Sequence, residues 1–221
     1  MQKTLGFRFA DSQLLQQALT HRSAVGANNE RFEFLGDAVL DFVVSDIVFA
    51  SHTSASEGDL SRLRASLVND ASLAKVAKGL GVGDHLILGE GEKKSGGHHR
   101  NSILADALEA IFAAVYLDAG IEAAEKVIRQ AFGERLVNLP PIDSLRDPKT
   151  RLQEWLQARA ETLPAYELVE TSGKAHNRRF VVCCSIRDGA RMSTGSGTTR
   201  RKAEQEAAAE MLDKLSATPS S

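Results

Sequence analysis

Apolar residues before residue 138 recur at the spacing of an α-helix. Leu60, Leu63 and Leu67, for example, fall on one helix face. Two longer segments, 30–50 and 103–117, carry apolar residues on almost all sides. A helix that is apolar all round is typical of a bundle core rather than of a surface. Because strand-like alternation is absent here, the first part of the chain is predicted to be all-α.

The pattern after residue 148 is mixed. Residues 152–156 predict an amphipathic helix, and residues 180–186 alternate between two faces as a strand does. Residues 166–170 and 190–194 are the expected partner strands. A last helix carries small and apolar residues on one face: Ala203, Ala207, Ala208, Met211, Leu212 and Leu215. The order α-β-β-β-α predicts a small α+β domain.

A proline-rich stretch separates the two patterns. Residues 138–148 contain three of the five prolines of the chain. Proline lacks the amide hydrogen and disfavours helix at the residue before it, so this stretch predicts a linker. We therefore expect one domain over residues 1–139, a linker over 140–147 and a second domain over 148–217.

The two parts differ in charge, although the whole chain has a net charge of only −2. Residues 1–145 hold 14 basic and 19 acidic residues, whereas residues 146–221 hold 13 basic and 10 acidic residues. An acidic first part and a basic second part indicate metal chemistry in the one and binding of a polyanion in the other.

Composition also narrows the compartment. We expect no membrane segment, because no apolar run approaches the roughly 20 residues that span a bilayer, and the N-terminus lacks the apolar core of a secretory signal. Cys183 and Cys184 are the only cysteines and are adjacent, which is too few for a disulfide framework. A cytoplasmic location is therefore expected.

Carboxylates lie in the two apolar segments of the first part. Glu30, Glu33 and Asp37 share one face of the first segment, and Asp106 and Glu109 share a face of the second. Single acids in average helices are usually solvated, but buried carboxylates must be paired, protonated or bound to a cation. Ligation by oxygen alone suits Mg²⁺ or Mn²⁺. A carboxylate-bound divalent ion is suited to phosphoryl-transfer chemistry.

Basic residues cluster where the last helix is expected to begin. Arg200, Arg201 and Lys202 lie at its N-terminus, where the helix dipole already supplies partial positive charge. Cations there disfavour the free helix, but they combine with the exposed amides into a phosphate-binding site. The alternative is a solvated run of charge with no ligand.

Residues 29–40 resemble the signature of the ribonuclease III family at essentially every position. Residues 19–23, 57–61 and 102–110 resemble further blocks of the family, in the family's order. The resemblance implies a divalent-metal-dependent hydrolase of double-stranded RNA that leaves 5′-phosphate and 3′-hydroxyl ends with short 3′ overhangs. Its expected substrates are precursors of ribosomal RNA and other structured transcripts.

The same resemblance assigns roles to individual acids. Glu33, Asp37, Asp106 and Glu109 match the metal-binding acids, with Asp37 and Glu109 the most critical. We expect Mg²⁺ as the cofactor, with Mn²⁺ as a substitute. Two supporting acids match positions associated with the active-site valley and the dimer contact: Glu30 and Glu57.

Residues 147–216 resemble a double-stranded RNA-binding domain. Such domains recognise A-form geometry through two minor grooves and the phosphates between them. By resemblance, Gln153 and Glu154 touch one minor groove and His176 reaches the next. The basic residues at the start of the last helix match the phosphate clamp: Arg200, Arg201 and Lys202.

One acidic cluster cuts one strand, so two strands require a homodimer, as in the family. Phe34 is out of phase with Leu35, Val39 and Phe42, which we expect to face the core. A large aromatic off the core face marks either spare packing or an association surface, and we expect Phe34 at the dimer interface. The rival hypothesis is a non-catalytic RNA-binding protein that uses a retired nuclease domain, but such a domain would be free to lose its acids.

Overall fold

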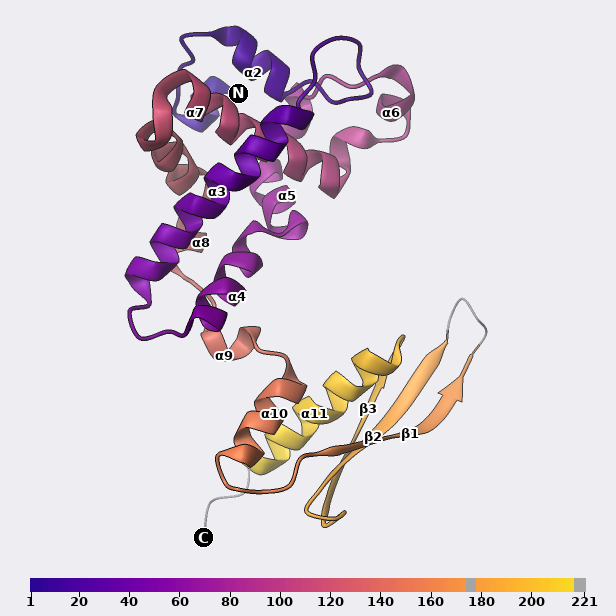
Figure 1. Cartoon of the computed structure of the whole chain (residues 1–221). Helices are drawn as coiled ribbons and strands as arrows, with labels where there is room; N and C mark the ends of the chain where they lie inside the picture. Colours follow the sequence, from indigo (N-terminus) through magenta and orange to yellow (C-terminus); the bar gives the residue numbers. More distant parts are fainter. Residues whose placement is uncertain (174–177, 217–221) are drawn as a thin grey trace. The chain divides into compact units, whose positions relative to one another are not determined.

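A computed structural model of the chain describes residues 1–173 and 178–216. The chain divides into two compact units, Met1–Pro140 and Pro141–Ser221 (Figure 1). No helix in the described ranges is both long and apolar enough to cross a membrane.

The first unit is helical, as the sequence predicts. Its elements are α1 (Gln2–Leu5), α2 (Ser12–Ala18), α3 (Glu30–Ser51), α4 (Glu57–Val68), α5 (Asp70–Gly79), η1 (Val82–His85), α6 (Glu90–Lys94), η2 (Gly97–His99), α7 (Asn101–Phe132) and α8 (Glu134–Val137). An isolated bridge joins Thr20 and Ile87. Side chains on the N-terminal caps define several helix starts, because Asp11, Ser56 and Asn69 each accept a backbone N–H of the following turn.

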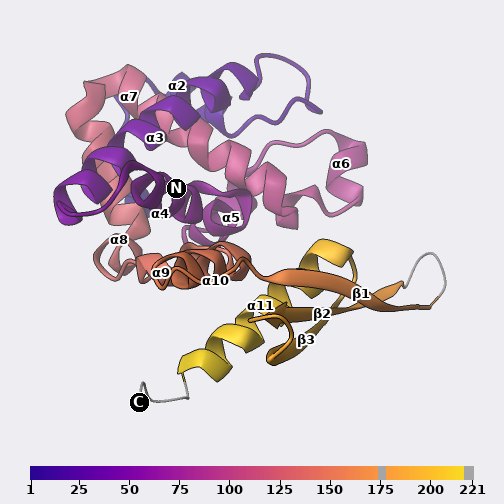
Figure 2. The ribbon, with the colours of Figure 1, turned by 60° about the horizontal axis from the view of Figure 1, so that its bottom comes forward.

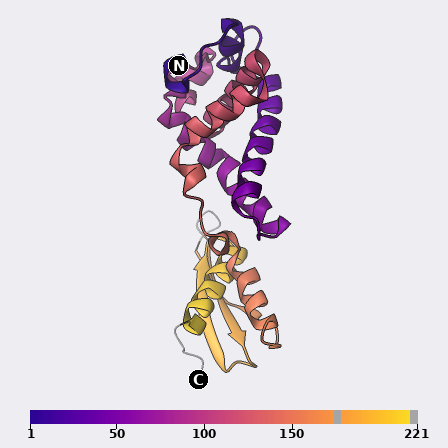
Figure 3. The ribbon, with the colours of Figure 1, turned by 90° about the vertical axis from the view of Figure 1, so that its left-hand side faces the viewer.

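The core of the first unit is built around α7. Residues 103–115 of this helix are almost all buried, and α3 packs against it (Figure 3). The backbone of α7 breaks at Gly120, where φ is 81°. This conformation is one that glycine adopts readily. The residues after the break continue along the helix bundle to Phe132, which is again buried.

The second unit has the predicted α-β-β-β-α order. Its elements are α9 (Ile142–Leu145), α10 (Pro148–Gln157), β1 (Ala165–Ser172), β2 (Arg179–Ile186), β3 (Arg191–Gly197) and α11 (Arg200–Ser216). The strands form one antiparallel sheet in the order β1-β2-β3, with a register shift between Leu168 and Glu170. Both longer helices of this unit lie on one face of the sheet (Figure 2).

The core of the second unit fills the space between α10, α11 and the sheet. Its buried members come from all three: Leu152, Leu156, Cys184, Ile186, Ala207, Ala208, Met211, Leu212 and Leu215. The alternation predicted for β2 holds in part: Val182, Cys184 and Ile186 are fully buried, but Cys183 between them is buried as well. The strand β3 extends beyond the expected residues 190–194 and ends at Gly197.

Candidate functional site

The backbones of α3 and α7 approach closely at Gly36, one residue before Asp37. A Cβ atom at this position would lie 1.9 Å from the carbonyl oxygen of Glu109 and 2.4 Å from its carbonyl carbon. Only glycine allows two backbones to come this near. Since Glu33 and Asp37 flank Gly36, the contact sets the acids of α3 beside the acids of α7.

The pKa values of Glu33, Asp106 and Glu109 show that these carboxylates share one electrostatic environment. Burial, followed by the charges of Asp37, Asp106 and Glu33, raises the pKa of Glu109 to about 8. Burial and then Asp106 also raise the pKa of Glu33. The pKa of Asp106 is raised by burial and then by Asp70. Desolvation and like charge both favour the neutral form of a carboxyl, so Glu109 is largely protonated at neutral pH unless a cation is present.

The donor set fits a hard divalent cation. All four acids offer oxygen, the ligand that Mg²⁺ and Mn²⁺ prefer. Burial and neighbouring carboxylates raise the pKa values of Glu33, Asp106 and Glu109, so a cation at this place would relieve an unfavourable environment for their charged forms. Within residues 1–173 and 178–216, however, no three His, Cys, Asp or Glu side chains converge closely enough to enclose an ion. Binding a cation therefore requires these side chains to turn toward one another.

A cleft of about 800 Å³ opens beside Glu33 and Asp106. It is lined by His21, Arg22, Ser23, Asn28, Asn29, Glu30, Glu33, Glu92, Arg100, Ser102, Ile103 and Asp106. Glu30 lies at its rim, 3.7 Å from Arg22 in an exposed ion pair. Arg22 and His21 act on the acids electrostatically, since both lower the pKa of Asp106.

Sequence reasoning missed this role of Arg22 and His21. Both residues lie in the block 19–23, which resembles the family. This resemblance could have pointed to them as site residues. His21 is buried, with its ring Nδ1 2.8 Å from Ser23 Oγ. Asp70 was missed as well. It is exposed at the start of α5, yet its charge raises the pKa of both Asp106 and Glu109.

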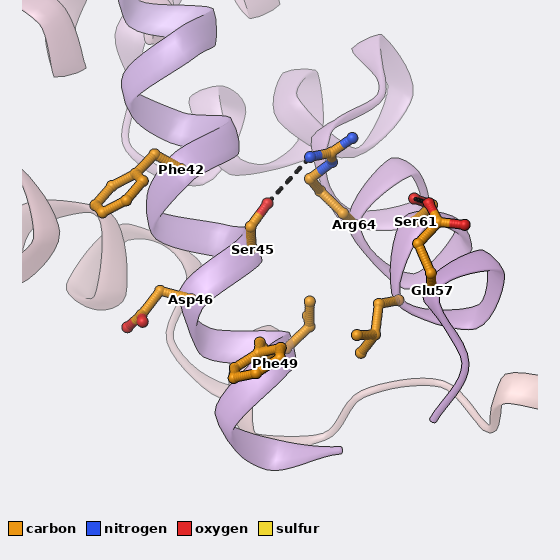
Figure 4. A pocket seen from close by; sticks show the side chains of 9 residues that line it. Phe42, Ser45, Asp46, Phe49, Glu57, Ser61 and Arg64 are labelled. Carbon is orange, nitrogen blue, oxygen red and sulfur yellow. Dashed lines mark hydrogen bonds between the residues drawn. The ribbon is translucent and has the colours of Figure 1, made fainter. Parts of the chain in front are cut away.

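The second supporting acid, Glu57, lies at a different place. It begins α4, where its carboxylate accepts a hydrogen bond from Ser61 Oγ at 2.8 Å. It lines a pocket of about 300 Å³ between α3 and α4 (Figure 4). The structure thus brings Glu30 to the cleft beside the metal-site acids, whereas Glu57 belongs to this second pocket.

One side of α3 exposes three aromatic side chains. Phe34 is 82% exposed, Phe42 62% and Phe49 70%, and the last two line the pocket between α3 and α4 (Figure 4). The expectation that Phe42 faces the core is therefore wrong, and α3 is not buried all round. Phe34 is off the core face, as predicted. An apolar stripe on an isolated chain indicates an association surface.

The positions predicted to touch a minor groove lie on the outer side of α10. Gln153 and Glu154 are exposed, whereas Leu152 and Leu156 of the same helix are buried in the core. The helix starts at Asp147, whose side chain accepts the N–H of Thr150 at 2.8 Å. His176, the other predicted groove contact, lies outside the described residues.

The predicted phosphate clamp forms the first turn of α11. Arg200, Arg201 and Lys202 are all exposed there. The strand before them comes unusually close to the helix, because a Cβ atom at Gly197 would lie 2.7 Å from the backbone nitrogen of Ala203. The glycine therefore allows β3 to run directly into the basic turn. There the amide of Lys202 donates to Thr199 Oγ1 and Arg200 Nε donates to Glu204 Oε1, and the basic side chains remain exposed to solvent.

Models of known families match both units. Residues 11–136 match a family described as ribonuclease-III-like, and residues 148–215 match the double-stranded RNA binding motif. The first match covers more than half of the chain.

Full-length relatives extend the match. A protein named Ribonuclease 3 from Alkalilimnicola ehrlichii is 52% identical over 97% of this chain and 94% of its own length. A Ribonuclease 3 from Psychromonas ingrahamii is 51% identical over 98% of this chain and 94% of its own length.

A solved structure resembles the first unit of this chain in its fold. It is the nuclease domain of ribonuclease III from Campylobacter jejuni, described as showing structural flexibility in a region involved in dimer formation. It is 47% identical with a TM-score of 0.58, and the match covers 59% of this chain and 93% of that domain. The fold, the order of the two units and these matches together show that the chain belongs to the ribonuclease III family.

Proposed function

We propose that this protein is an endoribonuclease that hydrolyses phosphodiester bonds in double-stranded RNA, with residues 1–139 as the nuclease domain and 148–217 as the RNA-binding domain. The observation that carries the proposal is the contact of Gly36 with the Glu109 backbone. This contact brings the acidic faces of α3 and α7 together. In the same chain, the second unit carries exposed basic residues at the start of α11. Products with 5′-phosphate and 3′-hydroxyl ends and short 3′ overhangs, and ribosomal RNA precursors as substrates, are further parts of the proposal.

The ribonuclease III family depends on a divalent metal ion. In this chain Glu33, Asp37, Asp106 and Glu109 would hold it, and we propose Mg²⁺ as the natural ion, with Mn²⁺ as a substitute. Such an ion lowers the pKa of bound water and stabilises charge on the phosphoryl oxygens. The protein's own contribution is to fix the carboxylates on two packed helices and to set Arg22 beside them, where its charge lowers the pKa of Glu33 and Asp106.

The second unit would recognise A-form RNA by shape. Exposed Gln153 and Glu154 face outward from α10, in keeping with contacts to the 2′-hydroxyls of a minor groove. The basic turn of α11 would bind phosphates without regard to sequence. His176 remains a proposed contact on the resemblance alone.

A homodimer would supply a second acidic site for the second strand. We propose that Phe34 lies at its interface, because Phe34, Phe42 and Phe49 expose an apolar stripe along one side of α3. The pocket that Phe42 and Phe49 share with Glu57 lies on the same side (Figure 4). A twofold contact is self-complementary, so each copy would present the same stripe. A cytoplasmic location is also proposed, in keeping with two free, buried thiols.

The experiment that tests the function is incubation with a long RNA duplex, with Mg²⁺ or with EDTA, followed by analysis of product size and ends. We expect short duplex products with 5′-phosphates only when Mg²⁺ is present. Replacing Arg200, Arg201 and Lys202 together by Ala should weaken duplex binding for all sequences alike and reduce its salt dependence. A protein that binds the duplex but never cuts it would instead support the rival hypothesis of a retired nuclease domain.

A further inference from the structure

An arginine from outside the RNA-binding motif holds one of the residues predicted to touch RNA. Arg146 Nη1 donates a hydrogen bond to Glu154 Oε2 at 2.8 Å. Arg146 precedes the segment 148–215 that matches the motif. The ion pair therefore connects the chain just before the domain to the groove-facing side of α10.

The arginine is well placed to fix this carboxylate. It immediately precedes Asp147, whose carboxylate caps α10, and its backbone is extended. The Arg146 side chain is only 24% exposed, whereas the Glu154 side chain is 48% exposed. The Arg146 side chain is thus largely covered by protein, whereas about half of the Glu154 side chain is open to solvent.

A carboxylate on an RNA-binding face presents an electrostatic problem. Its charge repels the phosphates on either side of the groove, yet its oxygens are strong acceptors for the 2′-hydroxyl, the group that distinguishes RNA from DNA. An arginine on the protein side solves the problem, because it neutralises the charge and fixes the orientation of the acceptor. Arginine is suited to this task because its planar fork of donors matches a carboxylate.

We propose that Arg146 is a positioning residue for duplex RNA: it neutralises and orients Glu154 so that this carboxylate accepts a 2′-hydroxyl from the minor groove. The proposal rests on the proposed function, because it requires the second unit to bind duplex RNA. It makes residue 146, which lies in the expected linker, part of the selection of RNA over DNA.

The test compares the affinities of the full-length protein for RNA and DNA duplexes of one sequence, in EDTA so that no strand is cut. Arg146→Ala should weaken RNA binding about tenfold, as expected for loss of a charge-assisted hydrogen bond and exposure of an unpaired carboxylate. DNA binding should change much less, so the ratio of RNA to DNA affinity should fall. The ratio of RNA to DNA affinity of Arg146→Lys should lie between that of the parent protein and that of Arg146→Ala.

Arg159→Ala is the matched control. This substitution removes the same charge from the other end of α10, where the guanidinium lies 3.8 Å from the centre of the Trp155 ring. It should leave the RNA-to-DNA ratio unchanged. Far-UV CD of each variant reports folding, and a purely structural role for Arg146 would lower stability without moving the ratio.

A double-mutant cycle with Glu154→Gln identifies the partner. If Arg146 acts through Glu154, Arg146→Ala should have less than about a twofold effect on RNA binding in the Glu154→Gln background. Should Arg146→Ala not fold, Glu154→Gln alone should still reduce the RNA-to-DNA ratio. Equal weakening for both duplexes together with additive effects would overturn the inference and leave Arg146 as a phosphate contact. A parent protein without preference for RNA would overturn the proposed function itself, and with it this inference.

Discussion

Neutralising Glu109 should stabilise the metal-free protein while abolishing its activity. The pKa of Glu109 is raised from its ordinary value of 4.5 to about 8, first by burial and then by Asp37 and Asp106. In the unfolded chain this carboxyl ionises near 4.5, whereas in the folded protein it stays protonated until about pH 8. The folded state is therefore favoured below pH 4.5 and loses that advantage progressively as the pH rises to about 8.

The size of the effect follows from the two pKa values. Their difference corresponds to about 5 kcal/mol for a fully buried group. Glu109 is only half-buried, and solvent screening reduces the electrostatic part, so we expect a net loss of about 2 kcal/mol. Glu109→Gln keeps the shape of the side chain and cannot ionise. Its free energy of unfolding in EDTA should exceed that of the parent by about 2 kcal/mol at pH 8 and by almost nothing at pH 4.5.

The assay is urea unfolding of both proteins in EDTA across this pH range, followed by far-UV CD. The CD signal reports the helical first unit, whereas fluorescence of Trp155, the only tryptophan, reports the second unit, and the two transitions are to be treated separately. Glu122→Gln, an exposed change on the same helix α7, is the matched control. Mg²⁺ should stabilise the parent at pH 8 and leave Glu109→Gln almost unaffected. RNA cleavage should disappear in Glu109→Gln while duplex binding persists.

Two results would refute this reasoning. One is a Glu109→Gln protein no more stable than the parent at pH 8 in EDTA, which would mean that Glu109 is not held in an unfavourable environment. The other is cleavage at a near-normal rate with ordinary Mg²⁺, which would remove Glu109 from the metal site.

Three further changes test other parts of the molecule. Gly36→Ala should destabilise the first unit by about 3 kcal/mol or more in thermal melts, since its Cβ would meet the Glu109 carbonyl oxygen at 1.9 Å. The control Gly91→Ala, whose Cβ meets open space, should show a negligible change in stability. Phe34→Asp should sediment as a monomer with unchanged helical content and should no longer cut both strands, and a stable dimer would place the interface elsewhere. Asp147→Ala should lower the stability of the second unit by about 1 kcal/mol in Trp155 fluorescence melts, whereas Asp147→Asn should retain most of the cap.

The pattern of the sequence predicted the elements well, because local periodicity decides them. The helices of the first unit and the strand at residues 179–186 follow directly from spacings of 3.6 and 2 residues. The short helix α9 within the expected linker and the break at Gly120 were not predicted. The one is a single turn without a buried residue and the other a single glycine with positive φ, so a pattern of apolar residues contains no signal for them.

The phase of α3 shows where sequence reasoning fails. Phe42 is apolar and follows Val39 at helical spacing, so the pattern assigns it to the core, but the structure leaves it exposed beside Phe49. Burial inside a bundle and burial against a second protein select the same residue types, and a single sequence cannot distinguish them. The candidate metal acids stay a prediction, supported by the electrostatic coupling of Glu109 to Asp37 and Asp106. The nearby charges of Arg22, in the loop after α2, and of Asp70, at the start of α5, could be found only from the fold.

The contact at Gly36 has a consequence for how the site responds to ions of different size. With the backbones of α3 and α7 already in contact at Gly36, the helices cannot close further around a small ion, and separating them would break this close packing. The backbone at this contact is therefore rigid, and only the carboxylate side chains can adapt to the size of the ion. Asp37 is exposed, and Glu33 and Asp106 are half-buried. Rotation about single bonds meets low barriers, so exchange of one divalent ion for another should alter rotamers and leave the backbone in place.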